Sequence, residues 1–358
     1  MKHVFILGCE RSGSTWLSNI FAAHPDVAFY MEPFSVLTGL FPELPGRNTC
    51  CDVPDPRQAK VLRRGVAALP QAKFPLLYRP GRPPFLLGLD RAFSGLCMRL
   101  SRLAGTTVSR RASRFSVLNY NASTLPAAHA ARDGGSAPVR VIKELRLNFK
   151  GRLLAGAFPE AHFVVVIRHP GALCASVARH FERGALGELR ADLRHLADAV
   201  RHQPRLAAYR PLLPEPAAAR GDSALLPVWW LVNYDVLLAD LAAAGARVAV
   251  VSHEALSREP LKETVRLFAT CGLPLDPAVT RYVHASSTRQ GDPGVSMDTN
   301  RQSDRYFRSA IDDTPADMAE RIGQVLGAWA SAPGSDLGAG VGPYVMDYFD
   351  PATGRMRR

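Results

Sequence analysis

The stretch FILGCERSGSTWL, residues 5–17, decides how the rest of the sequence is interpreted. An apolar run leads to Gly8, a short loop of small and hydroxylated residues follows, and a second apolar pattern begins at Trp16. A strand, a glycine turn and a helix N-terminus together direct backbone N–H groups and the positive end of a helix dipole to one point. The stretch therefore predicts an anion site, with a glycine turn that binds nothing as the alternative.

The loop departs from the P-loop pattern of enzymes that bind nucleoside triphosphates. It matches G-x-x-x-x-G-K-[ST] at Gly8, Gly13 and Thr15. Ser14, however, stands where a lysine should reach the β- and γ-phosphates. A cation, Arg11, lies inside the loop instead. A ligand with a single 5′-phosphate needs less counter-charge than a triphosphate, so the loop predicts such a ligand.

Short apolar runs rich in Val, Ile and Phe recur along the chain, at 4–8, 27–31, 139–143, 163–167 and 247–251. Continuous apolarity is typical of strands that are buried on both faces, as in a parallel sheet. Helical periodicity lies between or after these runs, at 15–24, 260–272 and 314–330. This alternation predicts a doubly wound, P-loop-like α/β fold with a central parallel sheet of about five strands. Ligands of such folds bind at the carboxyl ends of the strands.

Two long segments rich in Pro, Arg and Ala interrupt the alternation, at about 35–137 and 182–226. We expect them to fold over the strand ends as a lid or an acceptor site, with a poorly ordered surface excursion as the alternative for parts such as AAHAARDGGSAP, residues 127–138. Residues 1–330 then form a single domain with helical insertions. The remainder, 331–358, is expected to be a loosely packed C-terminal tail.

Composition narrows the class of protein. No run of about 18 apolar residues and no secretory leader stands out, so we expect no transmembrane segment and a cytoplasmic protein. The six cysteines lack C-x-x-C spacing, which favours reduced thiols and no metal site. The net charge of +12 comes from dispersed Lys and Arg residues. An anionic small molecule or an acidic substrate explains this charge as well as a nucleic acid does, and without interleaved aromatics we expect no nucleic-acid partner.

The motif ERSGSTWL, residues 10–17, resembles the 5′-phosphosulfate loop of sulfotransferases that use 3′-phosphoadenosine 5′-phosphosulfate (PAPS). In that family a Lys or Arg precedes Ser-Gly-(Ser/Thr)-Thr. The residues that the resemblance assigns to the 5′-phosphate are Arg11, Ser12, Gly13, Ser14 and Thr15. It also implies that Trp16 stacks on the adenine, although a core tryptophan on the apolar helix face is an equal alternative.

A second motif, VVVIRHPGALCASVARH at residues 164–180, strengthens the resemblance. It has Arg168 at the end of a buried strand and Ser176 eight positions later, in the predicted helix. In the PAPS-dependent family an arginine and a serine with this spacing bind the 3′-phosphate. A guanidinium matches phosphate oxygens as a planar fork, and the hydroxyl adds a further donor.

Sulfonate transfer needs a cation at the leaving oxygen and a base for the acceptor hydroxyl. The resemblance gives Arg11 the first task, and it gives Lys143, at the end of a strand, the stabilisation of the transition state. Glu32 is the candidate base and Glu144 its competitor, while Glu32 as a structural partner of Arg11 is an equal alternative. Many small-molecule members use a histidine at the position of Leu145, which argues against that usage here.

The pattern is most similar to the carbohydrate sulfotransferase branch. His-Pro-Asp-Val, residues 24–27, leads to Glu32 as in glycan sulfotransferases. Phe307-Arg308 stands where that branch has a Trp-Arg pair. The expected activity is metal-free transfer of sulfonate from PAPS to a hydroxyl, of a carbohydrate or a glycosylated metabolite. A P-loop small-molecule kinase and a non-catalytic nucleotide-binding relative are the alternatives. The missing Gly-Lys and the Arg168/Ser176 pair argue against the kinase.

Overall fold

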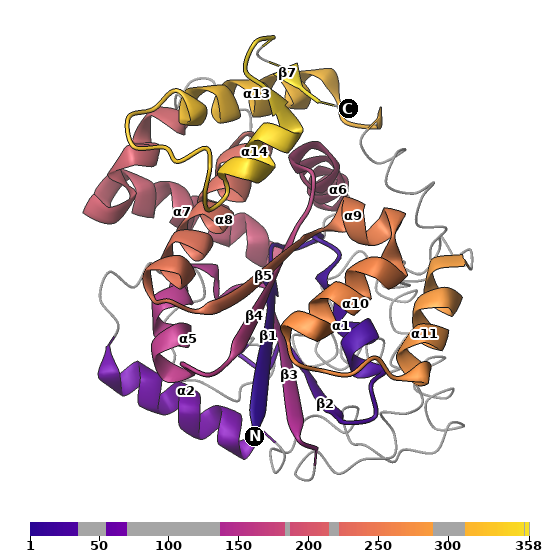
Figure 1. The fold of residues 1–358 in the computed structure, drawn as a ribbon. Helices are drawn as coiled ribbons and strands as arrows, with labels where there is room; N and C mark the ends of the chain where they lie inside the picture. The colour runs from indigo at the N-terminus through magenta and orange to yellow at the C-terminus, as the bar shows by residue number, and fades with distance from the viewer. Residues whose placement is uncertain are drawn as a thin grey trace, which may run out of the picture.

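A five-stranded parallel sheet lies at the centre of the computed structural model (Figure 1). The strands are β1 (Lys2–Gly8), β2 (Val27–Met31), β3 (Val139–Glu144), β4 (His162–Ile167) and β5 (Arg247–Ser252). Their order is β2-β3-β1-β4-β5, and every neighbouring pair is parallel. The structure describes residues 1–34, 55–69, 137–182, 187–214, 222–288, 312–353 and 355–357. The prediction of a doubly wound parallel sheet is confirmed.

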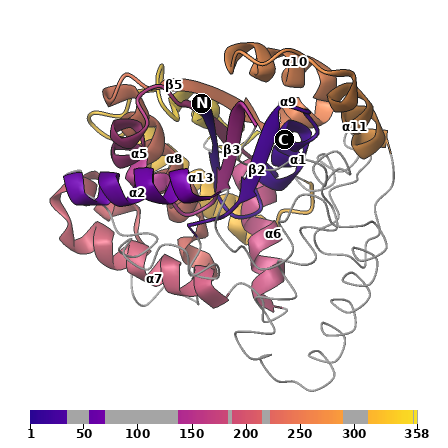
Figure 2. The ribbon, with the colours of Figure 1, turned by 90° about the horizontal axis from the view of Figure 1, so that it is seen from below.

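Alternating side chains of the strands face two hydrophobic clusters. Phe5 and Leu7 of β1 point into one cluster, while Val4 and Ile6 point into the other. Helices that build the first cluster are α2 (Pro56–Ala68), α5 (Gly151–Ala157), α6 (Pro170–Glu182), α7 (Gly187–His202), α8 (Leu226–Ala243) and α13 (Ala316–Ala330). Helices that build the second are α1 (Ser14–Ala22), α9 (His253–Arg258), α10 (Pro260–Thr270) and α11 (Pro277–Thr288). The sheet is thus covered by helices on both faces (Figures 1 and 2).

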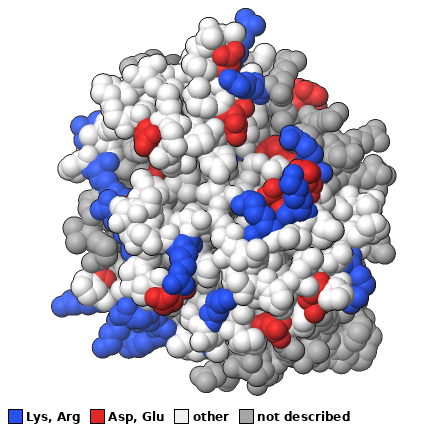
Figure 3. All heavy atoms as spheres, viewed as in Figure 1, with Lys and Arg blue, Asp and Glu red and all other residues white. Residues whose placement is uncertain are grey.

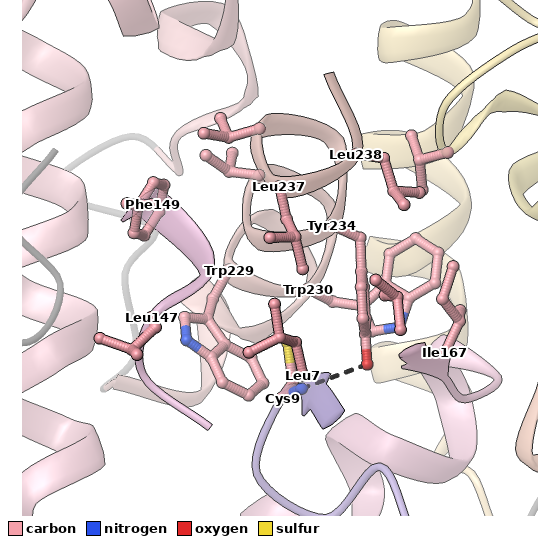
Figure 4. Packing of buried hydrophobic residues seen from close by; sticks show 14 of the residues in the cluster. Leu7, Cys9, Leu147, Phe149, Ile167, Trp229, Trp230, Tyr234, Leu237 and Leu238 are labelled. Carbon is pink, nitrogen blue, oxygen red and sulfur yellow. Dashed lines mark hydrogen bonds between the residues drawn. The ribbon is translucent and has the colours of Figure 1, made fainter. Parts of the chain in front are cut away.

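Helix α8 forms the centre of the first cluster (Figure 4). With the short turn before it, α8 forms the helical stretch Asp222–Ala243, whose length and composition would suffice to cross a membrane. However, 78% of its apolar window is buried inside the protein, as in a core helix. The hydroxyl of Tyr234 donates to the carbonyl oxygen of Val166 at 2.8 Å and accepts from the backbone N–H of Cys9 at 3.3 Å. One buried side chain therefore ties the ends of β1 and β4 together.

The second insertion is part of the core. Helix α7 lies within the predicted segment 182–226 and buries Leu189, Leu193 and Val200 in the first cluster. The short helices η3 (Pro204–Leu212) and η4 (Asp222–Leu225) follow it. The surface-excursion alternative concerned parts such as residues 127–138, most of which lie outside the described residues, and the lid role stays a prediction. Most of segment 35–137, and Phe307-Arg308, lie outside the described residues.

Residues 331–340 are mostly exposed and form no helix or strand, but the segment from Val341 on is packed, so the expectation of a loose tail is wrong for that second half. Helix α14 (Gly342–Tyr348) and a two-stranded ribbon of β6 (Phe349–Asp350) and β7 (Arg355–Met356) follow α13. Val345 and Phe349 are buried in the first cluster. Glycine-rich composition suggested flexibility, but the apolar side chains spaced along α14 find a core to pack against.

Part of the basic charge lies on one helix. Lys and Arg gather at the lower left of Figure 3, where Figure 1 places α2. The exposed cations of α2 are Arg57, Lys60, Arg63 and Arg64. Its opposite face packs inward, and the carbonyl oxygen of Val66 accepts from Arg140 Nη1 near the start of β3 at 3.0 Å. These cations lie toward the amino ends of the strands, so the net charge of the chain does not all belong to the predicted anion site.

Candidate active site

The loop between β1 and α1 is a tight turn with two left-handed residues. Arg11 has φ 68° and Gly13 has φ 90°. Gly13 is also the N-cap of α1, and no side chain among the described residues caps this helix. The first turn of an α-helix has N–H groups without intrahelical partners. The loop thus presents backbone donors and the helix dipole to an anion, as the sequence predicts.

Two glycines of the loop have no room for a side chain. A Cβ on Gly8 would lie 2.8 Å from Ser12 Oγ and 2.9 Å from the carbonyl oxygen of Val166. A Cβ on Gly13 would lie 2.1 Å from Cδ2 of His253. His253 is the first residue of α9, directly after β5, so a residue more than 200 positions further along the chain packs against the loop. Burial lowers the pKa of His253 well below its usual value, with a further contribution from Arg168, and the ring packs as a neutral group.

The two predicted phosphate motifs meet at Arg11. Arg11 Nε donates to Ser176 Oγ at 3.3 Å, and Arg168 Nη1 donates to the backbone carbonyl oxygen of Arg11 at 2.7 Å. Arg168 and Ser176 are both buried. Arg168 follows the last residue of β4, and Ser176 lies on α6, which begins at Pro170. The structure therefore brings the guanidinium of Arg168 against the loop that carries Arg11.

Lys143 and Glu32 form an ion pair at the ends of β3 and β2. Lys143 Nζ contacts Glu32 Oε1, and the lysine side chain is 2% exposed against 33% for the glutamate. The backbone N–H of Glu32 also donates to the carbonyl oxygen of Lys143 at 2.7 Å. Glu32 has φ 48°, a left-handed conformation that is uncommon outside glycine. This turn brings its carboxylate beside Lys143, so the structure pairs Glu32 with Lys143, whereas the structural alternative from the sequence was Arg11.

Glu144 is buried and holds the segment after β2. Its Oε1 accepts from the backbone N–H of Phe34 at 2.6 Å. Burial raises the pKa of Glu144 to about 8, and the nearby charge of Glu32 adds to the effect. The hydrogen bond from Phe34 and the charges of Lys143 and Arg146 act in the opposite direction but do not outweigh the burial. An incoming hydroxyl would reach Glu32 more readily than Glu144.

Trp16 packs in the core. It is 7% exposed, lies in the second hydrophobic cluster and donates from Nε1 to Ser286 Oγ of α11 at 3.0 Å. Its ring also meets His253 edge-on, with the centroids 6.3 Å apart. This placement is the one that the core alternative predicts, and stacking on adenine stays a prediction.

Comparison with known proteins identifies the family. A sequence model described as "Sulfotransferase family" matches residues 3–277, which include the loop, the Arg168/Ser176 motif and Lys143. The chain belongs to the sulfotransferase family. Among curated proteins, none matches the sequence.

Several solved structures of sulfotransferases are similar to this one. The sulfotransferase domain of the Synechococcus PCC 7002 olefin synthase is 18% identical, with a TM-score of 0.43, over 93% of this chain and 96% of that chain. The sulfotransferase domain from the curacin biosynthetic pathway is 12% identical, with a TM-score of 0.42, over 93% and 99% of the two chains. A sulfotransferase from Alicyclobacillus acidocaldarius is 16% identical, with a TM-score of 0.34, over 91% and 95%.

The candidate site also contains a charged cluster that sequence analysis missed. Arg146, just after β3, donates from Nε to Glu10 Oε1 at 2.8 Å, and its Nη1 lies 3.2 Å from Asp192 Oδ2 on α7. Glu10 belongs to the loop, and burial raises its pKa. A single guanidinium thus links the loop to the second insertion. In the sequence, Glu10 and Arg146 are only charged residues that follow two predicted strands. Nothing there shows that residues 136 positions apart form a pair.

Metal ligands were not expected for this sulfotransferase. In the described ranges, no group of three or more His, Cys, Asp or Glu side chains could hold a metal ion. The described cysteines Cys9, Cys174 and Cys271 are free and buried. Metal-free transfer stays a prediction.

Proposed function

We propose that this sulfotransferase moves a sulfonate from PAPS to an acceptor hydroxyl, of a carbohydrate or a glycosylated metabolite. The observation that supports the donor most is the hydrogen-bonded set of Arg11, Arg168 and Ser176. Two guanidinium groups and a hydroxyl from separate motifs meet beside a helix N-terminus. This charge suits a nucleotide with phosphates on both sides of one ribose.

Two buried polar atoms support the fit of such a ligand. Ser12 Oγ and Arg168 Nε are buried, and neither has a hydrogen-bond partner in the part of the chain that the structure describes. A buried polar group without a partner costs about 1–3 kcal/mol, and phosphate oxygens accept from both kinds of donor. By the family resemblance, Ser12 and the loop N–H groups hold the 5′-phosphate, while Arg168 and Ser176 hold the 3′-phosphate.

The cations of the site account for the transfer step. When bound, PAPS supplies a sulfonate attached to a phosphate leaving group. The bond from sulfur to the bridging oxygen breaks as the bond from sulfur to the acceptor oxygen forms. Arg11 compensates the negative charge that grows on the bridging oxygen, and Lys143 compensates the charge on the sulfonate oxygens. Both cations are fixed before reaction, Arg11 by Ser176 and Lys143 by Glu32.

Glu32 takes the proton of the acceptor hydroxyl. Its side chain is the more exposed of the two candidate carboxylates, and its ion pair with Lys143 orients it. Glu144 is closed off by burial and already accepts from Phe34. The proton leaves the acceptor oxygen as that oxygen attacks the sulfur, so the charge of the site is conserved.

The acceptor class is supported by the sequence alone. His24 and Asp26 belong to the His-Pro-Asp-Val stretch that resembles glycan sulfotransferases. His24 Nδ1 accepts from the backbone N–H of Asp26 at 3.0 Å, which orders the turn before β2. Strand β2 ends at Met31, and Glu32 is the next residue. The stretch that resembles glycan sulfotransferases therefore leads along the chain to the proposed base.

Ligand-dependent thermal unfolding of the full chain tests the donor. We expect adenosine 3′,5′-bisphosphate to raise the unfolding temperature more than AMP at equal concentration, because AMP lacks the 3′-phosphate. ATP with magnesium is the comparison for a kinase. Stabilisation by ATP that equals or exceeds that of the bisphosphate would overturn the proposal. Release of the bisphosphate from PAPS in the presence of a sugar acceptor then tests the transfer itself.

A further inference from the structure

The backbone around Arg168 is held from two helices. Trp230 Nε1 of α8 donates to the carbonyl oxygen of Arg168 at 2.8 Å. Glu254 Oε1 of α9 accepts from the backbone N–H of the next residue, His169, at 3.0 Å. These bonds fix the peptide unit from which the Arg168 side chain extends. The direction of its guanidinium thus depends on where Glu254 is held.

Glu254 is held in turn by the C-terminal segment. Its second carboxylate oxygen, Oε2, accepts from the hydroxyl of Tyr348 at the end of α14 at 3.1 Å. Burial raises the pKa of Glu254, while the charge of Arg168 and the bonds from His169 and Tyr348 act to lower it. Tyr348 is itself buried between Trp230 and His169, with ring centroids at 6.2 and 5.0 Å.

A second connection runs through the ring of His169. The backbone N–H of Gly171 donates to Nδ1 at 3.2 Å, so Nδ1 is the acceptor of the ring. Nε2 therefore carries the hydrogen and donates to the carbonyl oxygen of Arg357 at 3.1 Å. Burial lowers the pKa of His169 to about 4, which keeps the ring neutral and this donor pattern intact. Arg357 N–H donates back to the carbonyl oxygen of Tyr348 at 2.8 Å.

We propose that the C-terminal segment from Gly342 to Arg357 is a positioning element for the 3′-phosphate subsite. Tyr348 holds Glu254, which accepts from the backbone N–H of His169. The backbone of Arg357 holds the ring of His169. Both contacts thus fix the backbone from which the side chain of Arg168 extends. Neither Tyr348 nor Glu254 is assigned a contact with the donor, so both are positioning residues. The inference rests on the proposed function, because it takes Arg168 as the ligand of the 3′-phosphate.

A pair of ligands isolates this role. Adenosine 3′,5′-bisphosphate and AMP share the adenosine and the 5′-phosphate and differ in the 3′-phosphate. The dissociation constants of both are measured by calorimetric titration on the full chain, for the wild type and for Tyr348→Phe. We expect the variant to bind the bisphosphate about tenfold more weakly and AMP within about twofold, since one buried hydrogen bond to a charged group is lost.

Tyr344→Phe is the matched control. Tyr344 lies on the same helix and is partly buried, but its surroundings are Arg266, Asp347 and Glu263 rather than the Arg168 backbone. We expect this variant to bind both ligands as the wild type does. A general loosening of α14 would affect both variants alike, and equal losses for bisphosphate and AMP in Tyr348→Phe would overturn the inference. So would unchanged binding of the bisphosphate.

Glu254→Gln carries the test if Tyr348→Phe does not fold. Gln keeps a side-chain oxygen for the N–H of His169 and removes the charge that faces Arg168. We expect the same selective loss of bisphosphate binding, and its absence would overturn the inference. The wild-type titration separates the two proposals. A wild type that binds AMP as tightly as the bisphosphate would overturn the proposed function and the inference with it.

Discussion

The guanidinium of Arg168 donates from Nη1 to the carbonyl oxygen of Arg11 at 2.7 Å, although 157 positions separate the two residues. Each belongs to a different phosphate motif, and Arg11 Nε reaches Ser176 of the other motif at 3.3 Å. The sequence presents two separate phosphate sites. In the structure two hydrogen bonds join them, so we expect a change in either motif to alter the other.

Replacing Arg168 with Lys tests whether the fork of the guanidinium is needed. An ammonium group keeps the charge but offers no planar pair of donors, and it does not reproduce the bond to Arg11. We expect Arg168→Lys to weaken binding of adenosine 3′,5′-bisphosphate by about tenfold or more. Arg179→Lys, on the same helix as Ser176, is the control and should bind as the wild type does. Equal binding by Arg168→Lys and the wild type in a calorimetric titration would contradict the assignment.

Replacing Glu32 with Gln tests the proposed base. We expect kcat for transfer from PAPS to fall by about 100-fold or more, because general base catalysis contributes about 10²–10⁴. Binding of the bisphosphate should change by less than about twofold, because Glu32 is not assigned a donor contact. The variant also leaves Lys143 buried without its carboxylate partner, so the unfolding temperature should fall.

Glu144→Gln is the matched control for that experiment. It should keep most of the turnover, because Glu144 is buried and bonded to Phe34. Loss of turnover in Glu144→Gln together with an active Glu32→Gln would reverse the assignment of the base.

Glu144 also predicts a pH dependence of stability. Its pKa is raised from 4.5 to about 8 in the folded protein, so the neutral form is favoured there. The stability that this preference contributes is fully present below pH 4.5 and is lost as the pH rises through 8. Gln imitates the neutral carboxyl and still accepts from Phe34. We expect Glu144→Gln and the wild type to unfold at similar temperatures near pH 4, and the variant to be about 5 °C more stable at pH 8.5.

Scanning calorimetry at the two pH values measures this difference. The comparison between variant and wild type removes the contributions of other buried acids, such as Glu10 and Glu254. A variant that is less stable than the wild type at pH 8.5 would show that Glu144 is needed in its ionised form.

A side chain at position 13 would clash with His253, and shortening His253 should relieve the clash. Ala at this position would be strained at φ 90° and would place Cβ 2.1 Å from the ring of His253. We expect Gly13→Ala to lower the free energy of unfolding by more than about 2 kcal/mol in urea denaturation. His253→Ala in the same chain removes the contact and should recover part of the loss.

Gly245→Ala measures the cost of the backbone alone. Gly245 has φ 62°, and a Cβ at this position would meet no other part of the protein within 4 Å. Ala there should therefore lower the free energy of unfolding only through backbone strain, by about 1 kcal/mol. If Gly13→Ala were no more costly than Gly245→Ala, the packing of His253 against the loop would not limit this position.

Much of the fold was predictable because its signals are local. Each strand is a continuous apolar run, so Phe163 to Ile167 indicate a buried strand without knowledge of any partner. The loop from Gly8 to Gly13 is equally local, since glycines mark where a tight turn excludes side chains. The C-terminal segment was not predictable in this way. Its apolar residues are sparse, and only the burial of Val345 and Phe349 in the core shows that its second half is packed.

The site was predictable where a family motif fixed both residue and spacing, as for Arg11, Arg168 and Ser176. The site was not predictable where it consists of ion pairs between residues far apart in the sequence. Glu10 and Arg146 form an ion pair across 136 positions, and Lys143 rather than another cation pairs with Glu32. The chain has many Lys and Arg residues that could pair with either carboxylate, and the sequence does not show which of them does.

The sequence by itself determined the alternation of strand and helix, the glycine turn and the two cationic motifs, since these follow from side-chain pattern over a few residues. Only the tertiary structure decided which groups touch: Arg168 with Arg11, Tyr348 with Glu254, and His253 with Gly13. The reason is geometric. Parallel strands bring their carboxyl ends to one edge whatever their separation in the chain, and the contacts made there depend on strand order and burial, which no local pattern encodes.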